Sequence, residues 1–138
     1  MKKFVFIFVC LFAGTANAAV LDFGSLASGD LGVSSITLPE ATITNTSGGS
    51  LFVGAAGIDN ELCALSAGFN CQQDLEVDFN NLVSDLSFVV SGWGAGDSVL
   101  ATIYDIADSM IASLTIEANG LFDFGSASGI SRLVFDDS

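Results

Sequence analysis

The sequence predicts an all-β protein, an antiparallel two-sheet sandwich of about eight to ten short strands. Short runs rich in Val, Ile, Leu, Phe and Thr recur along the chain, and Gly, Ser, Asn and Asp separate them. No stretch keeps the apolar spacing of an amphipathic helix together with its caps. Many short strands at this spacing are typical of a sandwich, in which two sheets bury their apolar faces against each other.

The clearest strand covers residues 75–79. Strict alternation there puts Leu75, Val77 and Phe79 on one face and Glu76 and Asp78 on the other. We expect the first face to lie in the core and the second in water. The other expected strands are, in chain order, Val20–Leu26, Ser34–Leu38, Ala41–Thr46, Leu51–Gly54, Leu86–Val90, Ser98–Asp105, Met110–Glu117, Leu121–Phe124 and Ile130–Asp136, with Pro39 at a bend or sheet edge.

The chain begins with the pattern of a Sec-type signal peptide. Two lysines precede an unbroken apolar run over residues 4–13, and the small residues Ala16 and Ala18 stand where a signal peptidase reads them. The apolar run is shorter than the ~20 residues that a membrane-spanning helix needs. We therefore predict a signal peptide over residues 1–18 and a single β-sandwich domain over 19–138. The mature domain is expected to be secreted, extracellular or at the cell surface, with no membrane attachment after cleavage.

The charge balance of the mature chain excludes several classes of function. Beyond residue 18, Arg132 is the one cation among 16 Asp and Glu, and the sequence has no His. Nucleic acid and anionic lipid bind through Lys and Arg, so neither is an expected partner. Without His or Lys, a Ser or Cys nucleophile lacks its usual base. We therefore expect a protein that is not an enzyme.

Two cysteines remain after the predicted cleavage, Cys63 and Cys71. They bracket a short segment in which Gly68 and Asn70 favour a turn. An exported pair at this spacing predicts a disulfide that stiffens one loop. A zinc site is not expected, because two thiols without further Cys or His cannot complete a zinc shell.

Two kinds of ligand site have candidate residues. Trp93 lies in the glycine-rich segment 92–97, where an exposed ring would stack on a sugar; packing over the end of the sandwich is the alternative. Hard oxygen ligands, which suit calcium, gather at two places, and solvated acidic turns are the alternative there. These candidate calcium ligands are Asp59, Asn60 and Glu61, and Asp136 and Asp137.

The strand Glu76-Val77-Asp78-Phe79-Asn80 resembles the Glu-x-Asp-x-Glu strand of the laminarinase-like glycoside hydrolases. Asn80 stands where those enzymes have a third carboxylate, and those enzymes are much larger. Glycosidases need a carboxylic acid and a second carboxylate on either side of the scissile bond. An acid glycosidase remnant is therefore the least favoured of the three functions considered below.

Four segments together resemble a family of exported bacterial β-sandwich proteins: Leu51–Ile58, the Cys63–Cys71 loop, Val83–Phe88 and Ile130–Ser138. That family is similar to galactose-binding-like jelly rolls and often accompanies the exosortase (PEP-CTERM) sorting signal. The resemblance implies a jelly-roll-like sandwich at the cell surface or in the extracellular matrix. It also implies a structural calcium near the terminal strands, the only cofactor considered.

The chain departs from that family in two ways. No Pro-Glu-Pro tail, second apolar run or terminal Arg cluster is present, so the sorting signal is absent. Family members also continue past Phe135-Asp136-Asp137-Ser138 into a closing strand. The chain is thus either a complete domain or one without its closing C-terminal strand, and both interpretations stay open.

Three functions remain after these exclusions. The first is a structural or matrix-associated surface protein that contacts other surface proteins. The second is a carbohydrate-binding module for extracellular polysaccharide, supported or not by calcium. The third is the acid glycosidase remnant. The sequence favours them in that order, because a sandwich fold alone does not specify a ligand, and it does not indicate an oligomeric state.

Overall fold

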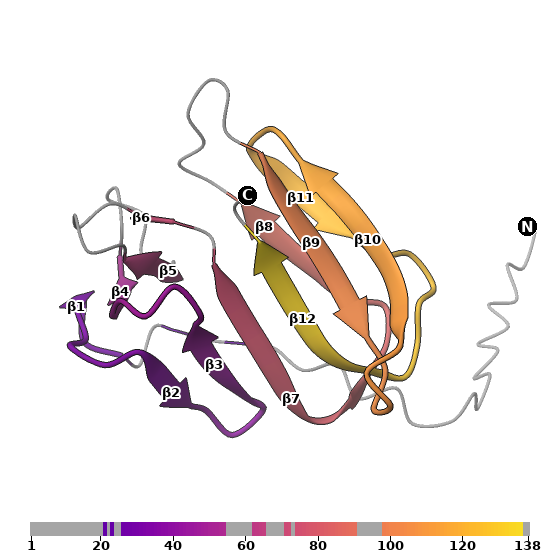
Figure 1. Ribbon diagram of the computed structural model, residues 1–138, viewed down its shortest axis with the longest axis horizontal. Coiled ribbons are helices and arrows are strands. Elements are labelled where there is room, and N and C mark those ends of the chain that lie inside the picture. Colours follow the sequence, from indigo (N-terminus) through magenta and orange to yellow (C-terminus); the bar gives the residue numbers. More distant parts are fainter. Residues whose placement is uncertain are drawn as a thin grey trace, which may run out of the picture.

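The computed structural model describes residues 21, 23, 26–54, 62–65, 71–72, 74–90 and 98–136. Across these ranges the regular elements are strands, and every strand pair is antiparallel (Figure 1). The described residues contain no helix that is long and apolar enough to cross a membrane. In chain order the strands are β1 (Gly29–Asp30), β2 (Ser35–Thr37), β3 (Ala41–Asn45), β4 (Leu51–Val53), β5 (Leu62–Leu65), β6 (Cys71–Gln72), β7 (Leu75–Val83), β8 (Ser87–Val90), β9 (Val99–Tyr104), β10 (Met110–Ile116), β11 (Gly120–Asp123) and β12 (Ile130–Asp136).

The predicted all-β antiparallel sandwich is confirmed, with more strands than the eight to ten expected. Hydrogen bonding divides them into a six-stranded sheet in the order β10-β9-β12-β7-β3-β2, a four-stranded sheet in the order β1-β4-β5-β6, and a two-stranded ribbon of β11 and β8. Three strands were not expected: β1, and β5 and β6, which lie in the cysteine segment where a loop was expected.

The strand expected at Val20–Leu26 was wrong for the residues described there. Leu21, Phe23 and Leu26 lie outside the strands. Leu21 and Phe23 nevertheless pack against the core, so the apolar side chains that suggested a strand are used as core-covering residues in irregular backbone. Burial of apolar side chains does not by itself require a ladder of backbone hydrogen bonds.

The inner face of the six-stranded sheet is apolar because the strand register aligns the apolar members of each alternating strand. Ile43 pairs with Val77, Val77 with Leu133, and Leu133 with Ile103, and all four side chains are buried. The row crosses four strands, β3, β7, β12 and β9. Each such side chain contributes about 1.5–3 kcal/mol through removal from water. The alternation predicted for residues 75–79 is therefore confirmed.

The β8–β11 ribbon covers part of this inner face, and Figure 1 shows it behind β9, β10 and β12. Its Phe88 ring meets the Phe135 ring edge to face at 5.1 Å and also packs on Phe122 and Phe124, each at 6.1 Å between ring centroids. Aromatic pairs of this geometry add to the stabilisation from area burial. The ribbon therefore joins the six-stranded sheet through a cluster of phenylalanines.

A polar junction connects the six-stranded sheet to the four-stranded one. Asn45, the last residue of β3, is 3% exposed. Its Nδ2 donates to the carbonyls of Ser50 (2.9 Å) and Leu65 (3.1 Å), and its Oδ1 accepts from the Ser47 amide (2.9 Å) and hydroxyl (2.6 Å). We call this set the Asn45 junction. The backbone turns after β3, and the Asn45 side chain also joins two sheets.

Gly49 allows the close approach that the Asn45 junction needs. A Cβ placed at this residue would lie 1.7 Å from the carbonyl oxygen of Leu65 on β5. No side chain fits there, because real Cβ contacts are much longer than this. The backbone at Gly49 is therefore packed directly against β5.

Candidate functional site

The outer face of the six-stranded sheet, turned away from the β8–β11 ribbon, carries the polar members of the alternating strands. The register aligns one row across all six strands, so that its side chains are cross-strand neighbours. From β2 to β10 the row contains Thr37, Thr42, Asp78, Arg132, Tyr104 and Met110. Arg132 lies at the centre of this row, on the central strand β12.

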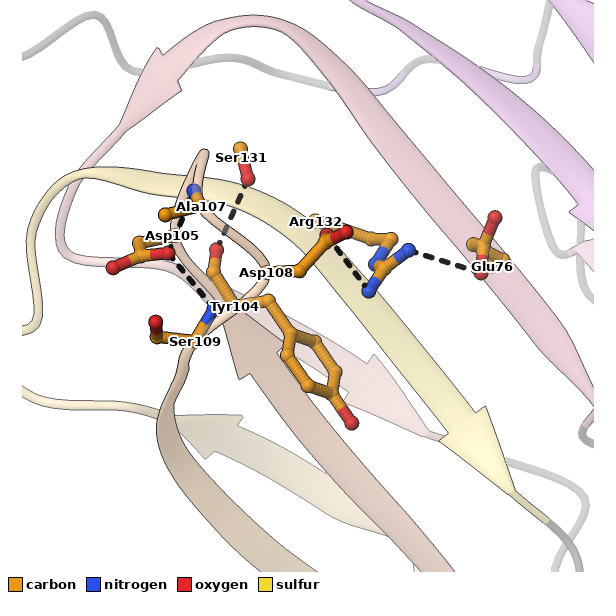
Figure 2. Close-up of polar contacts among 8 residues, drawn as sticks. All are labelled: Glu76, Tyr104, Asp105, Ala107, Asp108, Ser109, Ser131 and Arg132. Atoms are coloured by element: carbon orange, nitrogen blue, oxygen red, sulfur yellow. Dashed lines mark hydrogen bonds and ion pairs between the residues drawn. The ribbon is translucent and has the colours of Figure 1, made fainter.

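Arg132 is held by two carboxylates and one aromatic ring (Figure 2). Its Nη2 lies 3.1 Å from Asp108 Oδ1, and its Nη1 lies 3.9 Å from Glu76 Oε2. The guanidinium carbon stands 4.8 Å from the centre of the Tyr104 ring, a cation–π contact. The Nε is buried and makes no hydrogen bond to the residues described. One guanidinium therefore links β7, β9, β12 and the β9–β10 hairpin.

The pKa of Glu76, one of the two carboxylates paired with Arg132, is raised. Partial burial raises the pKa of Glu76, the charge of Asp78 on the same strand face raises the pKa further, and the Arg132 guanidinium lowers it in part. Desolvation and like charge therefore outweigh the ion pair. This environment favours a proton on Glu76 more than water does.

Two irregularities in strand pairing meet at this end of the sheet. The pairing of β7 with β12 changes register between the pair Arg132–Asp78 and the pair Ile130–Val83. The part of β7 that separates these two pairs is longer than the matching part of β12. Between β9 and β10 a second shift follows the pair Met110–Tyr104. Bulges of this kind redirect side chains and are frequent beside binding sites.

An open pocket of about 430 Å³ lies where the bulged part of β7 faces the β9–β10 hairpin. Its volume falls within the range of ligand sites. The lining contains both polar and apolar side chains, and the apolar side chains of Leu82 and Ile106 are exposed. The lining residues are Asp78, Phe79, Asn80, Asn81, Leu82, Ile106, Asp108, Ser131 and Arg132.

Hydrogen bonds within the β9–β10 hairpin fix one wall of this pocket. Asp105 Oδ1 accepts from the amides of Ala107 (2.8 Å) and Ser109 (2.9 Å), as Figure 2 shows. Asp108 takes the left-handed backbone conformation, with φ of 60°, which aspartate tolerates better than most residues. This turn holds the Asp108 carboxylate at Arg132.

The opposite wall is fixed by Asn80. Its Nδ2 donates to the carbonyl of Pro39 at 2.8 Å, and its backbone amide donates to the carbonyl of Glu40 at 2.9 Å. These bonds tie the bulged part of β7 to the β2–β3 turn. Both walls of the pocket are thus held by hydrogen bonds that do not involve its charged groups.

Most of the predicted site residues fall outside the described residues. This holds for Trp93, for the first calcium group Asp59, Asn60 and Glu61, and for Asp137, so those hypotheses stay predictions. Asp136 is exposed at the far end of β12, opposite Leu100 on β9. Among the residues that the structure describes, no group of three or more Cys, Asp or Glu side chains could hold a metal ion.

The two cysteines of the predicted disulfide lie on paired strands, Cys63 on β5 and Cys71 on β6. Leu65 of β5 pairs with Cys71 of β6, and Cys63 lies two residues earlier on β5 with 4% exposure. Cys63 is disulfide-bonded. The side chain of Cys71 lies outside the described residues, so its assignment as the partner stays a prediction.

Sequence reasoning missed the pocket. It assigned Asp78 to a solvated face and gave no role to Arg132, Asp108 or Asn81. One signal was available in the sequence. The alternation that begins at Leu75 fails at Asn81, because Asn80 and Asn81 are two polar residues in a row. A broken alternation within a strand indicates a bulge.

No family model, curated protein or solved structure matches this chain.

Proposed function

We propose that the mature chain is an exported, non-catalytic surface or matrix protein that binds polysaccharide in the pocket beside Arg132. The observation that carries this proposal is the meeting of two register shifts at one end of the outer sheet face. They leave a pocket of about 430 Å³ in a surface that would otherwise be a flat sheet face.

The lining chemistry suits a sugar. A sugar ring presents hydroxyl groups around its rim, which pair with flat donors and acceptors such as the carboxylate of Asp78 and the amide of Asn81. It also presents apolar C–H faces, which contact side chains such as Leu82 and Ile106. Ligand pockets combine apolar walls with a few placed polar groups in this way. A purely structural surface protein requires no such pocket.

Retention on immobilised polysaccharides tests the proposal. Residues 19–138 would be passed over a panel of neutral, amine-bearing and acidic glycans, and retention compared for the wild type, Asn81→Ala and Thr115→Ala. Thr115 pairs with Leu100 at the other end of the same sheet face and serves as the matched control. We expect Asn81→Ala to weaken retention about fivefold or more, since an unpaired ligand hydroxyl costs roughly 1 kcal/mol, and Thr115→Ala to have no effect.

Two outcomes would contradict this assignment. Retention lost in Trp93→Ala but unchanged in Asn81→Ala would move the site to the loop that the sequence indicated. Absence of retention on every glycan would leave the structural role, which is the first function that the sequence favours.

One observation favours the acid glycosidase as a second candidate. Glu76 has a raised pKa and shares a strand face with Asp78, and glycosidases use a carboxyl of raised pKa as their general acid. Release of reducing ends from a bound glycan, abolished by Glu76→Gln, would support it. Binding without release would support the non-catalytic proposal.

The exported location carries its own test. An oxidising compartment suits a Cys63–Cys71 disulfide, which we include in the proposal. Mass spectrometry of the secreted protein after alkylation without reductant should find both thiols unmodified, and a peptide joining Cys63 to Cys71 after digestion. Alkylation of Cys71 in the non-reduced protein would contradict this pairing.

A further inference from the structure

The charges around the pocket indicate which glycans it accepts. Three carboxylates, those of Glu76, Asp78 and Asp108, lie around a single guanidinium. The guanidinium is already shared between Asp108 at 3.1 Å and Glu76 at 3.9 Å. Arg132 is also the one Lys or Arg among the described residues. An anionic ligand would therefore meet a cation that is paired and a surface that is negative.

Asp78 is the carboxylate best placed to meet a ligand. It lies directly opposite Arg132 in the register, yet the ion pairs of Arg132 run to Asp108 and Glu76. Asp78 shares a side-chain hydrogen bond with Glu76, but it is exposed and lines the pocket. A cation entering the pocket would find this carboxylate accessible, and an ammonium–carboxylate hydrogen bond is stronger than one between neutral groups.

We infer that the pocket prefers amino sugars, whose free ammonium groups pair with Asp78 and Asp108, over neutral, N-acetylated and acidic sugars. This inference rests on the proposed function and names the ligand class of the same site. The apolar rim formed by Leu82 and Ile106 contacts the ring, and the carboxylates select the charge. Each exposed ion pair between a carboxylate and an ammonium group increases affinity by a modest factor, roughly 1.4- to 5-fold. Strong retention therefore needs several such ion pairs along one polymer.

The test compares three oligosaccharides that differ in charge: a β-1,4-linked glucosamine oligomer, its fully N-acetylated form and an oligogalacturonate of equal length. Binding to residues 19–138 would be measured by calorimetry at low salt and again in 1 M NaCl. The variants are Asp78→Asn and Asp108→Asn, with Glu117→Gln as the control. Glu117 is exposed just after β10, at the far end of the sheet, and its variant changes the net charge equally.

We expect the amine-bearing oligomer to bind at least fivefold more tightly than its N-acetylated form and the oligogalacturonate to bind least. Asp78→Asn should reduce the preference severalfold, and Asp108→Asn should also reduce it, because loss of Asp108 leaves the Arg132 cation less opposed. Glu117→Gln should leave the preference unchanged. In 1 M NaCl the preference should largely disappear, since salt at that concentration screens charges beyond about 3 Å.

Each contrary result has a distinct meaning. Equal or tighter binding of the N-acetylated oligomer or the oligogalacturonate, lost in Asn81→Ala, would overturn this inference and leave the proposed function standing. Equal weakening by Glu117→Gln would also overturn it, because the preference would then come from the net charge of the molecule. Absence of binding by all three would overturn both, with circular dichroism of each variant showing that it is folded.

Discussion

Two polar clusters in this molecule contrast in burial and charge. The Asn45 junction is neutral and buried, and its four hydrogen bonds are short. The Arg132 site is charged and half open: the side chains of Arg132, Glu76 and Asp108 are 26%, 29% and 75% exposed. The first connects two sheets, and the second lies on the outer face of one.

This difference in burial and charge suits the Asn45 junction to stabilising the fold and the Arg132 site to binding. A buried polar group costs free energy unless every donor and acceptor is paired, so removing a member of the Asn45 junction leaves unpaired groups in the core. Exposed ion pairs contribute little to stability because water and salt screen them. We therefore expect changes at the Asn45 junction to lower stability strongly, and changes at the Arg132 site to alter binding with little effect on stability.

The largest effect is expected from Gly49→Ala. The added Cβ would lie 1.7 Å from the Leu65 carbonyl oxygen, so β5 must move and the Asn45 hydrogen bonds must break. We expect a loss of about 4 kcal/mol or more in the free energy of unfolding, measured by urea denaturation. Gly48→Asn is the control: Gly48 has open space around it and a φ of 85°, which asparagine tolerates at a cost of ~1 kcal/mol. Equal stability of the two variants would contradict the close packing at Gly49.

The next effect is expected from Asn45→Ala, which removes the Asn45 donor to the Leu65 carbonyl and one of the two donors to the Ser50 carbonyl, which keeps the Leu65 amide. We expect a loss of about 1–3 kcal/mol, the cost of one unpaired buried group. Thr44→Ala is the matched control, because Thr44 lies on the outer face and shares a hydrogen bond with Ser35 at an exposed edge. If both variants lost the same stability, the Asn45 junction would have no special role.

A smaller effect is expected from Arg132→Gln. The substitution removes two partly exposed ion pairs and a cation–π contact, so the free energy of unfolding should fall by about 1 kcal/mol or less. Removal of the cation also leaves the carboxylates unopposed, which should increase the preference for amine-bearing glycans. Calorimetry on the same sample measures both quantities. A destabilisation as large as that of Asn45→Ala would show that the outer site is structural.

The smallest effect is a pH dependence at Glu76. Its pKa in the folded state is raised, so folding favours the protonated form. The stabilising contribution is complete below the ordinary pKa of about 4.3 and is lost as the pH rises through the folded value. Glu76→Gln should therefore be more stable than the wild type at pH 7 and lose this advantage near pH 4, as measured by Tm. A difference independent of pH would contradict this assignment.

The sequence predicted what depends on neighbours along the chain. The alternation at residues 75–79 determined which side chains are buried, because each strand residue turns opposite to the one before it. The bulge after Asn80 depends on pairing with β12, about fifty positions later, and on the lengths of both strands. The burial of Asn45 likewise depends on β5, twenty positions later in the chain. Local patterns therefore predicted the sheet faces, and non-local pairing created the pocket.

The central position of Arg132 also affects how the molecule meets proteases. Among residues 19–138, Arg132 is the one site at which a trypsin-like enzyme cuts. It lies in β12, which is hydrogen-bonded to β7 on one side and β9 on the other. A protease must bind an extended stretch of chain, so β12 has to leave the middle of the sheet before the cut, which amounts to opening most of the domain. The folded domain should resist digestion. The rate at which trypsin cuts it into two fragments would measure how often the sheet opens.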